Sequence, residues 1–361
     1  MTEQTRLTRA GVEIHPDVEY EGLTGGFSQA WDLHPELRRE RWFTFADLPI
    51  RMLVVGPGLA TDIFRAFSHL QRDDRTGPPA LTISLWDEGE TGIGLRGVTP
   101  EDDLNEHGEN FASDDGMVVI TARPQTRTGL QRLERKLVGW VADHGRLTQY
   151  ELGRPLHSEL MLWHKDRNVQ AIHAGLVARD GDGILFGGPG GSGKSSTALT
   201  SLKAGFEYMA DDYVGLKELG DGTYEGHSLF CSTHLEPGHL RRFPYLLPHA
   251  IPGRLPREDK SLVMLSDVLP DGLSRKARIR AVALPIVVGA DKPRLRPATT
   301  IEALLRLAPS SLILLPYAGV AAGEFEKLSR FLENIPTYWL ELGEDMEEIP
   351  MRIGELLERH G

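Results

Sequence analysis

One stretch of the chain reads Gly187-Gly188-Pro189-Gly190-Gly191-Ser192-Gly193-Lys194-Ser195, which matches every position of a Walker A loop. The apolar run Ile184-Leu185-Phe186 precedes it, and residues 197–204 follow as a helix candidate. Strand, glycine-rich loop and helix in this order form the context in which such loops bind a nucleoside triphosphate. The alternative is a glycine-rich turn that carries a lysine by chance, and the complete match in the right context disfavours it. The sequence therefore predicts an α/β domain that binds a nucleotide.

The loop residues have separate expected roles. Glycines let backbone N–H groups turn inward toward phosphate oxygens at a helix N-terminus. Lys194 is expected to reach the β and γ phosphates of ATP, and Ser195 to offer its hydroxyl to Mg²⁺. The full set expected to contact the nucleotide is Gly188, Gly190, Gly191, Ser192, Gly193, Lys194, Ser195 and Ser196.

Two adjacent carboxylates, Asp211 and Asp212, lie only a short helix beyond the loop, too near for the distant metal-binding acid of most large ATPases. Neighbouring residues on a strand point to opposite faces, so we expect different roles for them unless the strand ends between them. One can hold Mg²⁺ while the other faces a phosphate acceptor. A solvent-exposed turn is the alternative interpretation of the pair.

His173 belongs to a long apolar strand candidate, residues 169–178, which a tight turn joins to the strand entering the Walker A loop. This hairpin would hold His173 beside the phosphate site. By itself the residue is as consistent with a core histidine as with a catalytic one.

The accompanying motifs narrow the class of nucleotide-binding protein. The Asn-Lys-x-Asp motif of GTPases and the Leu-Ser-Gly-Gly-Gln signature of transporters are both missing from the sequence. A lysine on the γ phosphate, a bridging metal and a carboxylate that accepts a hydroxyl proton make a kinase site. The residues therefore favour transfer of a phosphoryl group to a hydroxyl.

Three ordered motifs resemble the C-terminal catalytic domain of HPr kinase/phosphorylase: His173-Ala174-Gly175-Leu176-Val177, the Walker A loop, and residues 204–214 with Ala210-Asp211-Asp212. That family phosphorylates a serine on the phosphocarrier HPr, and its fold is similar to the nucleotide-binding part of phosphoenolpyruvate carboxykinase. The resemblance implies that Asp211 is the general base with His173 as its partner. It also implies that Asp212 and Ser195 are close to the metal and that Lys194 clamps the phosphates.

The chain of 361 residues is long enough for two domains, and we place the boundary near residue 150. Residues 151–361 are predicted to form the catalytic domain. Residues 1–150 are predicted to form a smaller α/β or α+β accessory or substrate-recognition domain. Its first fifty residues are interpreted as polar and irregular, followed by strands at 52–55, 81–86, 117–120 and 137–141 and a helix at 59–70.

The formal net charge of −12 argues against a protein that coats nucleic acid or an anionic membrane. Cys231 is the only cysteine, so an intramolecular disulfide is excluded. Because no apolar run reaches the length of a membrane span and the N-terminus lacks a secretion signal, a cytoplasmic location is expected.

These observations together predict an ATP- and Mg²⁺-dependent kinase that acts on a hydroxyl, of serine type, in a small molecule, a peptide or a protein. The alternative is a nucleotide-sensing regulatory or adaptor protein with little turnover. A homo-oligomer is left open, because no coiled-coil pattern predicts one.

Overall fold

The structure, a computed structural model, describes residues 6–7, 13–75, 77–98, 108–254, 258–312 and 321–361. The chain divides into two compact units. Unit 1 comprises residues 1–160, 235–244 and 250–262, and unit 2 comprises residues 161–234, 245–249 and 263–361. The main change from unit 1 to unit 2 thus comes at residue 160, and two later segments return to unit 1.

Unit 1 is built on a mixed sheet with strand order β5-β3-β4-β6-β10-β9-β8-β7. The central strands β4, β6 and β10 are parallel, and the outer neighbours pair antiparallel. Its strands are β3 (Arg38–Phe45), β4 (Leu48–Val55), β5 (Gln71–Arg72), β6 (Leu81–Asp87), β7 (Glu109–Ala112), β8 (Val118–Ala122), β9 (Thr126–Gln131) and β10 (Lys136–Val141). A separate pair is formed by β1 (Arg6–Leu7) and β2 (Glu13–Ile14). The strands expected at 52–55, 81–86, 117–120 and 137–141 all lie within or overlap this set.

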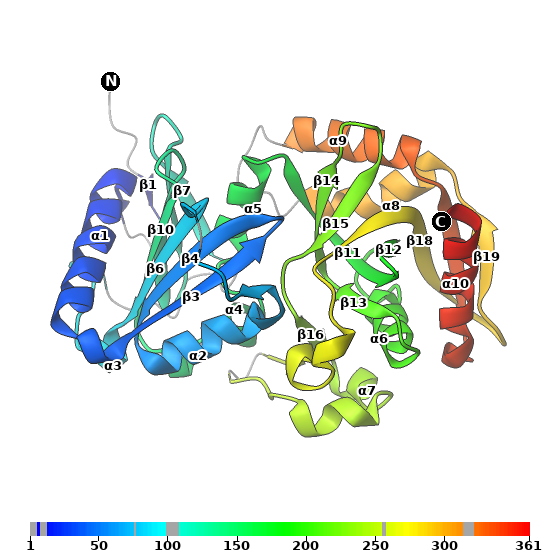
Figure 1. Cartoon of the computed structure of the whole chain (residues 1–361), viewed down its shortest axis with the longest axis horizontal. Helices are drawn as coiled ribbons and strands as arrows, with labels where there is room; N and C mark the ends of the chain where they lie inside the picture. Colours follow the sequence, from blue (N-terminus) through cyan, green and yellow to red (C-terminus); the bar gives the residue numbers. More distant parts are fainter. Residues whose placement is uncertain (1–5, 8–12, 76, 99–107, 255–257, 313–320) are drawn as a thin grey trace. The chain divides into compact units, whose positions relative to one another are not determined.

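The helices of unit 1 cover both faces of the sheet (Figure 1). Helix α1 (Pro16–Leu33) packs on β8, β9 and β10, and α2 (Pro57–Ala66) packs on β3 and β4. Trp86 faces α1 in a cluster with Leu23 and Trp140, so the alternate residue Leu85 faces the α2 side. Short helices α3 (Glu88–Thr91), α4 (Gln149–Gly153) and α7 (Pro237–Leu240) complete the unit, and α5 (His157–Lys165) begins in it.

The expectation of an irregular first fifty residues was wrong, because α1 and β3 occupy most of that range. The sequence did not predict α1 because this helix contains glycines, which disfavour helices, and has few buried apolar residues. Gly26 has a packing reason: a Cβ there would lie 2.7 Å from the Trp86 ring. The glycine lets the indole approach the helix backbone closely.

Unit 2 contains a second sheet, in the order β12-β11-β14-β15-β18-β20-β19, with β13 also paired to β11. Strand β18 also pairs with β12, so a closed circuit of pairings is formed by β12, β11, β14, β15 and β18. The strands are β11 (Val169–Arg179), β12 (Asp182–Gly187), β13 (Glu207–Ala210), β14 (Tyr213–Glu218), β15 (Tyr224–Ser228), β18 (Lys276–Ala290), β19 (Arg294–Pro297) and β20 (Thr337–Gly343). Two further strands, β16 (Ser232–Leu235) and β17 (Ser261–Met264), lie between β15 and β18 in the chain.

The helices of unit 2 pack against this sheet in two groups. Helices α6 (Lys194–Lys203) and α10 (Ile349–His360) contact each other and β11, β12 or β18. Helices α8 (Thr300–Leu312) and α9 (Ala321–Asn334) pack together, and their buried Leu307, Leu328 and Phe331 join the core of the sheet. Among the residues that the structure describes, no helix is both long and apolar enough to cross a membrane.

Candidate active site

The Walker A loop lies between β12 and α6, as its sequence predicts. Strand β12 is held between β11 and β18 and is buried from Gly183 to Gly187. Pro189, Gly190 and Gly191 at the crest of the loop are exposed. The loop therefore has a rigid base and an accessible crest.

The backbone of the loop leaves open space at its crest. Gly193 precedes α6 with a φ of 108°, and a Cβ there would lie 2.2 Å from Leu342, so no side chain fits. At Gly190 and Gly191 an added Cβ would meet no described atom within 4 Å. The Ser192 hydroxyl is buried and makes no hydrogen bond to any residue that the structure describes. The open space at Gly190 and Gly191 and the buried Ser192 hydroxyl could together accommodate a phosphate group.

Lys194, the first residue of α6, is turned onto its own loop. Its Nζ donates hydrogen bonds to the carbonyl oxygens of Gly188, at 2.7 Å, and Pro189, at 3.2 Å. The side chain is buried. Ser195 and Ser196 follow it in the first turn and are half-buried. The N–H groups of this turn have no partner inside the helix, which is the usual feature of an anion-binding helix end.

Sheet register brings the other candidate residues to the same end of unit 2. On β11, Ala174 is paired with Gly187, the last residue before the loop, and His173 is paired with Tyr213. The backbone N–H of Ala174 also donates to the carbonyl oxygen of Asp212. The predicted hairpin therefore exists, and it places His173 next to both the loop and the two aspartates.

His173 pairs with Asp212, whereas the resemblance implied a partnership with Asp211. The His173 Nε2 lies 2.6 Å from Asp212 Oδ1, and the two side chains are 16% and 30% exposed. The ring also lies against Tyr213, with 5.5 Å between ring centroids. The backbone of His173 is fixed from the other side, because its N–H donates to the Ser311 hydroxyl of α8.

Asp211 has a different environment. Its Oδ1 accepts a hydrogen bond from the Tyr208 hydroxyl at 3.0 Å, and its Oδ2 accepts one from the Thr233 hydroxyl at 2.6 Å. The residue is 5% exposed. The strand is interrupted here, since β13 ends at Ala210 and β14 begins at Tyr213. The two aspartates thus occupy a connection between strands, one inside and one at the surface.

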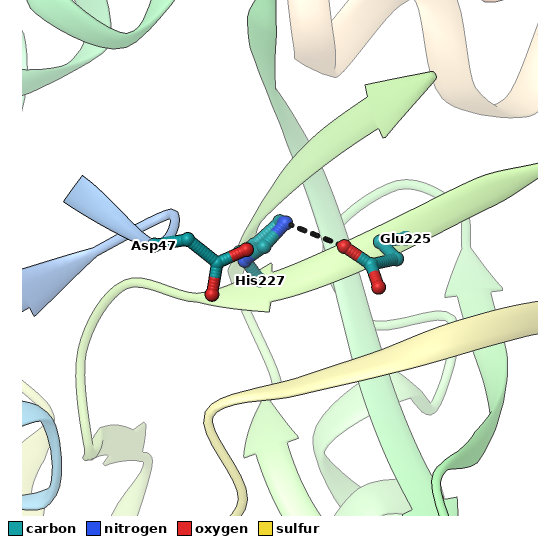
Figure 2. A group of neighbouring side chains, drawn as sticks. All are labelled: Asp47, Glu225 and His227. Atoms are coloured by element: carbon teal, nitrogen blue, oxygen red, sulfur yellow. Dashed lines mark ion pairs between the residues drawn. The ribbon is translucent and has the colours of Figure 1, made fainter. Parts of the chain in front are cut away.

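A second histidine–carboxylate pair lies on β15 (Figure 2). The Nε2 of buried His227 is 3.5 Å from Oε2 of Glu225, two residues earlier on the same face of the strand. Lys276 Nζ is 3.8 Å from the other oxygen of Glu225. We assign this pair no part in the chemistry of the loop.

Sequence reasoning missed Tyr208, Thr233 and Ser311, which position the aspartates and the histidine. Tyr208 could have been found, because it lies three residues before Asp211 in the segment that leads directly into the two aspartates. Thr233 and Ser311 come from distant parts of the chain, and no local pattern marks them.

Comparisons with known proteins found relatives of part of the chain, although no family model matches it. The HPr kinase/phosphorylase of Exiguobacterium sibiricum is 40% identical over 65 residues, which is 18% of this chain and 21% of that protein. The enzymes of Clostridium perfringens and Clostridium tetani are each 30% identical, over 120 and 125 residues, and these are 33% and 34% of this chain. The chain spans only 37% and 38% of those two relatives.

Among solved structures, the Hpr(Ser) kinase/phosphatase from Coxiella burnetii matches 53% of this chain and 95% of that chain, with 14% identity and a TM-score of 0.27. The sequence matches nevertheless agree on one kind of relative. Over the segments that they cover, the chain is similar to these HPr kinase/phosphorylases.

Proposed function

We propose that the protein is an ATP- and Mg²⁺-dependent kinase that transfers the γ-phosphoryl group to a hydroxyl of serine type. One observation carries this proposal. The pairing of β11 with β12 and β14 brings the open crest of the Walker A loop and the partly exposed pair of Asp212 and His173 to the same end of unit 2. A phosphate cradle beside a carboxylate that can accept a hydroxyl proton is what phosphoryl transfer requires. The kinase names of the partial relatives support the same class of reaction.

The nucleotide would lie on the loop, and bound ATP with Mg²⁺ would supply the phosphoryl group and neutralise its charge. Lys194 would leave the carbonyl oxygens of Gly188 and Pro189 and donate to phosphate oxygens instead. The Ser195 hydroxyl, in the first turn of α6, would contact the metal. The Ser192 hydroxyl gains the partner that it lacks among the described residues.

The geometry favours Asp212 as the proton acceptor. This assignment is the reverse of the one that the resemblance implied, in which Asp211 is the general base and Asp212 is close to the metal. Both oxygens of Asp211 accept hydrogen bonds from protein hydroxyls, and its side chain is almost inaccessible to an acceptor. Asp212 is accessible, and His173 holds its carboxylate in one orientation. In this assignment Asp212 takes the hydroxyl proton, and Asp211 would contact the metal ion through the lone pairs that its two hydroxyl donors leave open.

The acceptor is proposed as a class: a serine-type hydroxyl in a small molecule, a peptide or a protein. The relatives are named as kinases of HPr, but the chain spans less than two fifths of their length. Unit 1, which has its own sheet and core, is the proposed place for acceptor specificity.

The test is transfer of label from [γ-³²P]ATP to free serine, to a pool of serine peptides and to a size-fractionated extract. Wild type should label one of these fractions, and Asp212→Asn should lower transfer by about 10²–10⁴-fold with ATP affinity within a few fold of wild type. Asp211→Asn is the matched variant. If Asp211→Asn abolishes transfer while Asp212→Asn retains it, the exchange of roles is wrong although the kinase proposal stands.

The orientation of Lys194 supports one other function, that of a nucleotide sensor. Nucleotide binding would have to release the lysine from the loop carbonyls, and such a change of conformation can be read by a partner. Tight ATP binding without label transfer to any fraction would favour the sensor over the kinase.

A further inference from the structure

Unit 1 contains a half-open cavity of ≈ 30 Å³ on the face of its sheet opposite α1. Its wall is formed by side chains of α2, β6, β9 and β10 and by the segment from Leu147 to Leu156, which includes α4. The buried apolar members are Ile63, Leu85, Val141 and Leu147. Since about 10–15 Å³ of such space admits one water-sized group, the cavity has room for two or three.

The charged groups behind the cavity are already engaged with each other. Arg123 forms a two-pronged pair with Glu159, with Nη1 2.9 Å from Oε1 and Nη2 3.2 Å from Oε2. Glu151 accepts hydrogen bonds from the Thr126 hydroxyl and from the N–H and hydroxyl of Thr148. Burial raises the pKa of Glu151. These groups close the inner wall and leave little demand for a charged occupant there.

The residues at the mouth are partly exposed, and one of them, Arg154, is a cation. Tyr150, Arg154 and Leu156 form it. The Arg154 guanidinium lies over the Tyr150 ring at 4.5 Å from the centroid, and this stacking fixes its position. Arg154 lines the cavity, and the planar fork of donors in a guanidinium matches the geometry of a carboxylate.

The backbone at the mouth is strained. Leu156 has a φ of 57°, in the left-handed region, which costs a residue with a branched side chain roughly 1–2 kcal/mol. Such strain persists where the surrounding structure fixes it, and it is concentrated at ligand sites. Here it turns the chain between α4 and α5 so that both Arg154 and Leu156 line the same opening.

We propose that this cavity is a binding site for a short aliphatic carboxylate, with its branched alkyl end among Ile63, Leu85 and Leu147 and its carboxylate on Arg154. An isopropyl group has three carbon atoms, which suits the volume, and the charge of the carboxylate complements the mouth. The carboxylate can belong to a free acid or to the C-terminal residue of a peptide that ends in valine or leucine. The site does not depend on the proposed kinase chemistry.

Saturation-transfer NMR on the full chain without nucleotide tests this proposal, with isovalerate as the probe and isovaleramide as its neutral analogue. Isovalerate should saturate in the millimolar range, and isovaleramide should bind at least about tenfold more weakly, as expected for loss of a charge-assisted pair. Arg154→Ala should weaken isovalerate by a similar factor. Arg146→Ala removes an exposed arginine outside the cavity and should leave the affinity within about twofold.

A tripeptide ending in leucine, compared with its C-terminal amide, separates the two sources of carboxylate. Competition by the free peptide acid at lower concentration than isovalerate identifies a peptide C-terminus, and its failure identifies a free acid. The proposal is overturned if isovalerate does not saturate, if isovaleramide binds equally well, or if Arg154→Ala binds isovalerate as wild type does. The comparison of acid with amide uses the unaltered chain, so it holds even if a variant fails to fold.

Discussion

Two carboxylate–cation pairs show how differently the two units use charge. In unit 1, Glu159 and Arg123 are 0% and 4% exposed and share two short contacts, and the Thr128 hydroxyl also donates to Glu159. In unit 2, Asp212 and His173 are 30% and 16% exposed and share one contact. Burial alone would oppose both charges in unit 1, but their mutual attraction holds the pKa of Glu159 below its usual value. The buried pair is closed to solvent, whereas the accessible pair is open to a substrate hydroxyl, as the role proposed for Asp212 requires.

Glu159→Gln should have the largest effect on stability. It leaves the Arg123 guanidinium buried without its counter-charge, which typically lowers the free energy of unfolding by about 3–5 kcal/mol. Urea unfolding followed by circular dichroism measures the loss. The control is Arg123→Met combined with Glu159→Leu, which removes both charges and should recover part of the stability. A loss below about 1 kcal/mol for Glu159→Gln would mean that water reaches the pair.

Thr233→Val comes next and concerns the buried carboxylate of unit 2. Valine keeps the shape of threonine but takes one hydroxyl donor from Asp211, so we expect a loss of about 1.5–3 kcal/mol in the free energy of unfolding. Tyr208→Phe removes the donor to the other oxygen and should have a similar effect. Two variants with no measurable loss would show that Asp211 does not need its hydroxyl donors.

The sequence predicted the parts of unit 2 that depend on contiguous residues. Strand β12, the loop and α6 follow one another directly, so the motif and its context were visible together. The choice of Asp212 as the partner of His173 was not visible, because it depends on how the chain turns between β13 and β14. Adjacent aspartates differ in environment only after the sheet has formed.

Unit 1 was predicted less completely, for two physical reasons. Helix α1 contains glycine where Trp86 packs closely, and glycine lowers any helix expectation from sequence. The cavity is lined by residues from α2, β6, β9, β10, the turn before β9 and the segment from Leu147 to Leu156, and these residues form no motif. The central strands, in contrast, were visible as short apolar runs because both faces of the sheet are covered.

Asp212→Asn should change stability little, in contrast with Glu159→Gln. A pair that is partly exposed contributes at most about 1 kcal/mol after solvent screening, so the urea midpoint should stay close to that of wild type. Phosphoryl transfer by the same preparation should nevertheless be lost if the proposed role is right. A loss of several kcal/mol in the free energy of unfolding would show that Asp212 is needed for stability, as Glu159 is, and would contradict its proposed role in phosphoryl transfer.

The smallest expected effect comes from a third pair, His144 with Asp62 in unit 1, which are 30% and 21% exposed. The Nδ1 of His144 lies 3.0 Å from Asp62 Oδ2, and the Asp87 carboxylate is nearby. Burial by itself lowers the pKa of His144, but the Asp62 hydrogen bond and the charges of Asp87 and Glu90 outweigh it, so the pKa is raised above 6.5.

Because the folded pKa of His144 exceeds the unfolded one, the pair stabilises the protein fully below about pH 6.5 and loses this contribution as the pH rises through the folded value. Wild type should therefore exceed His144→Gln in stability by a few tenths of a kcal/mol more at pH 5.5 than at pH 8.5, a size typical of exposed pairs. Urea titrations of both proteins at the two pH values measure the difference. If the stability difference between wild type and His144→Gln grows toward alkaline pH, burial outweighs the carboxylates at His144 and its pKa is lowered.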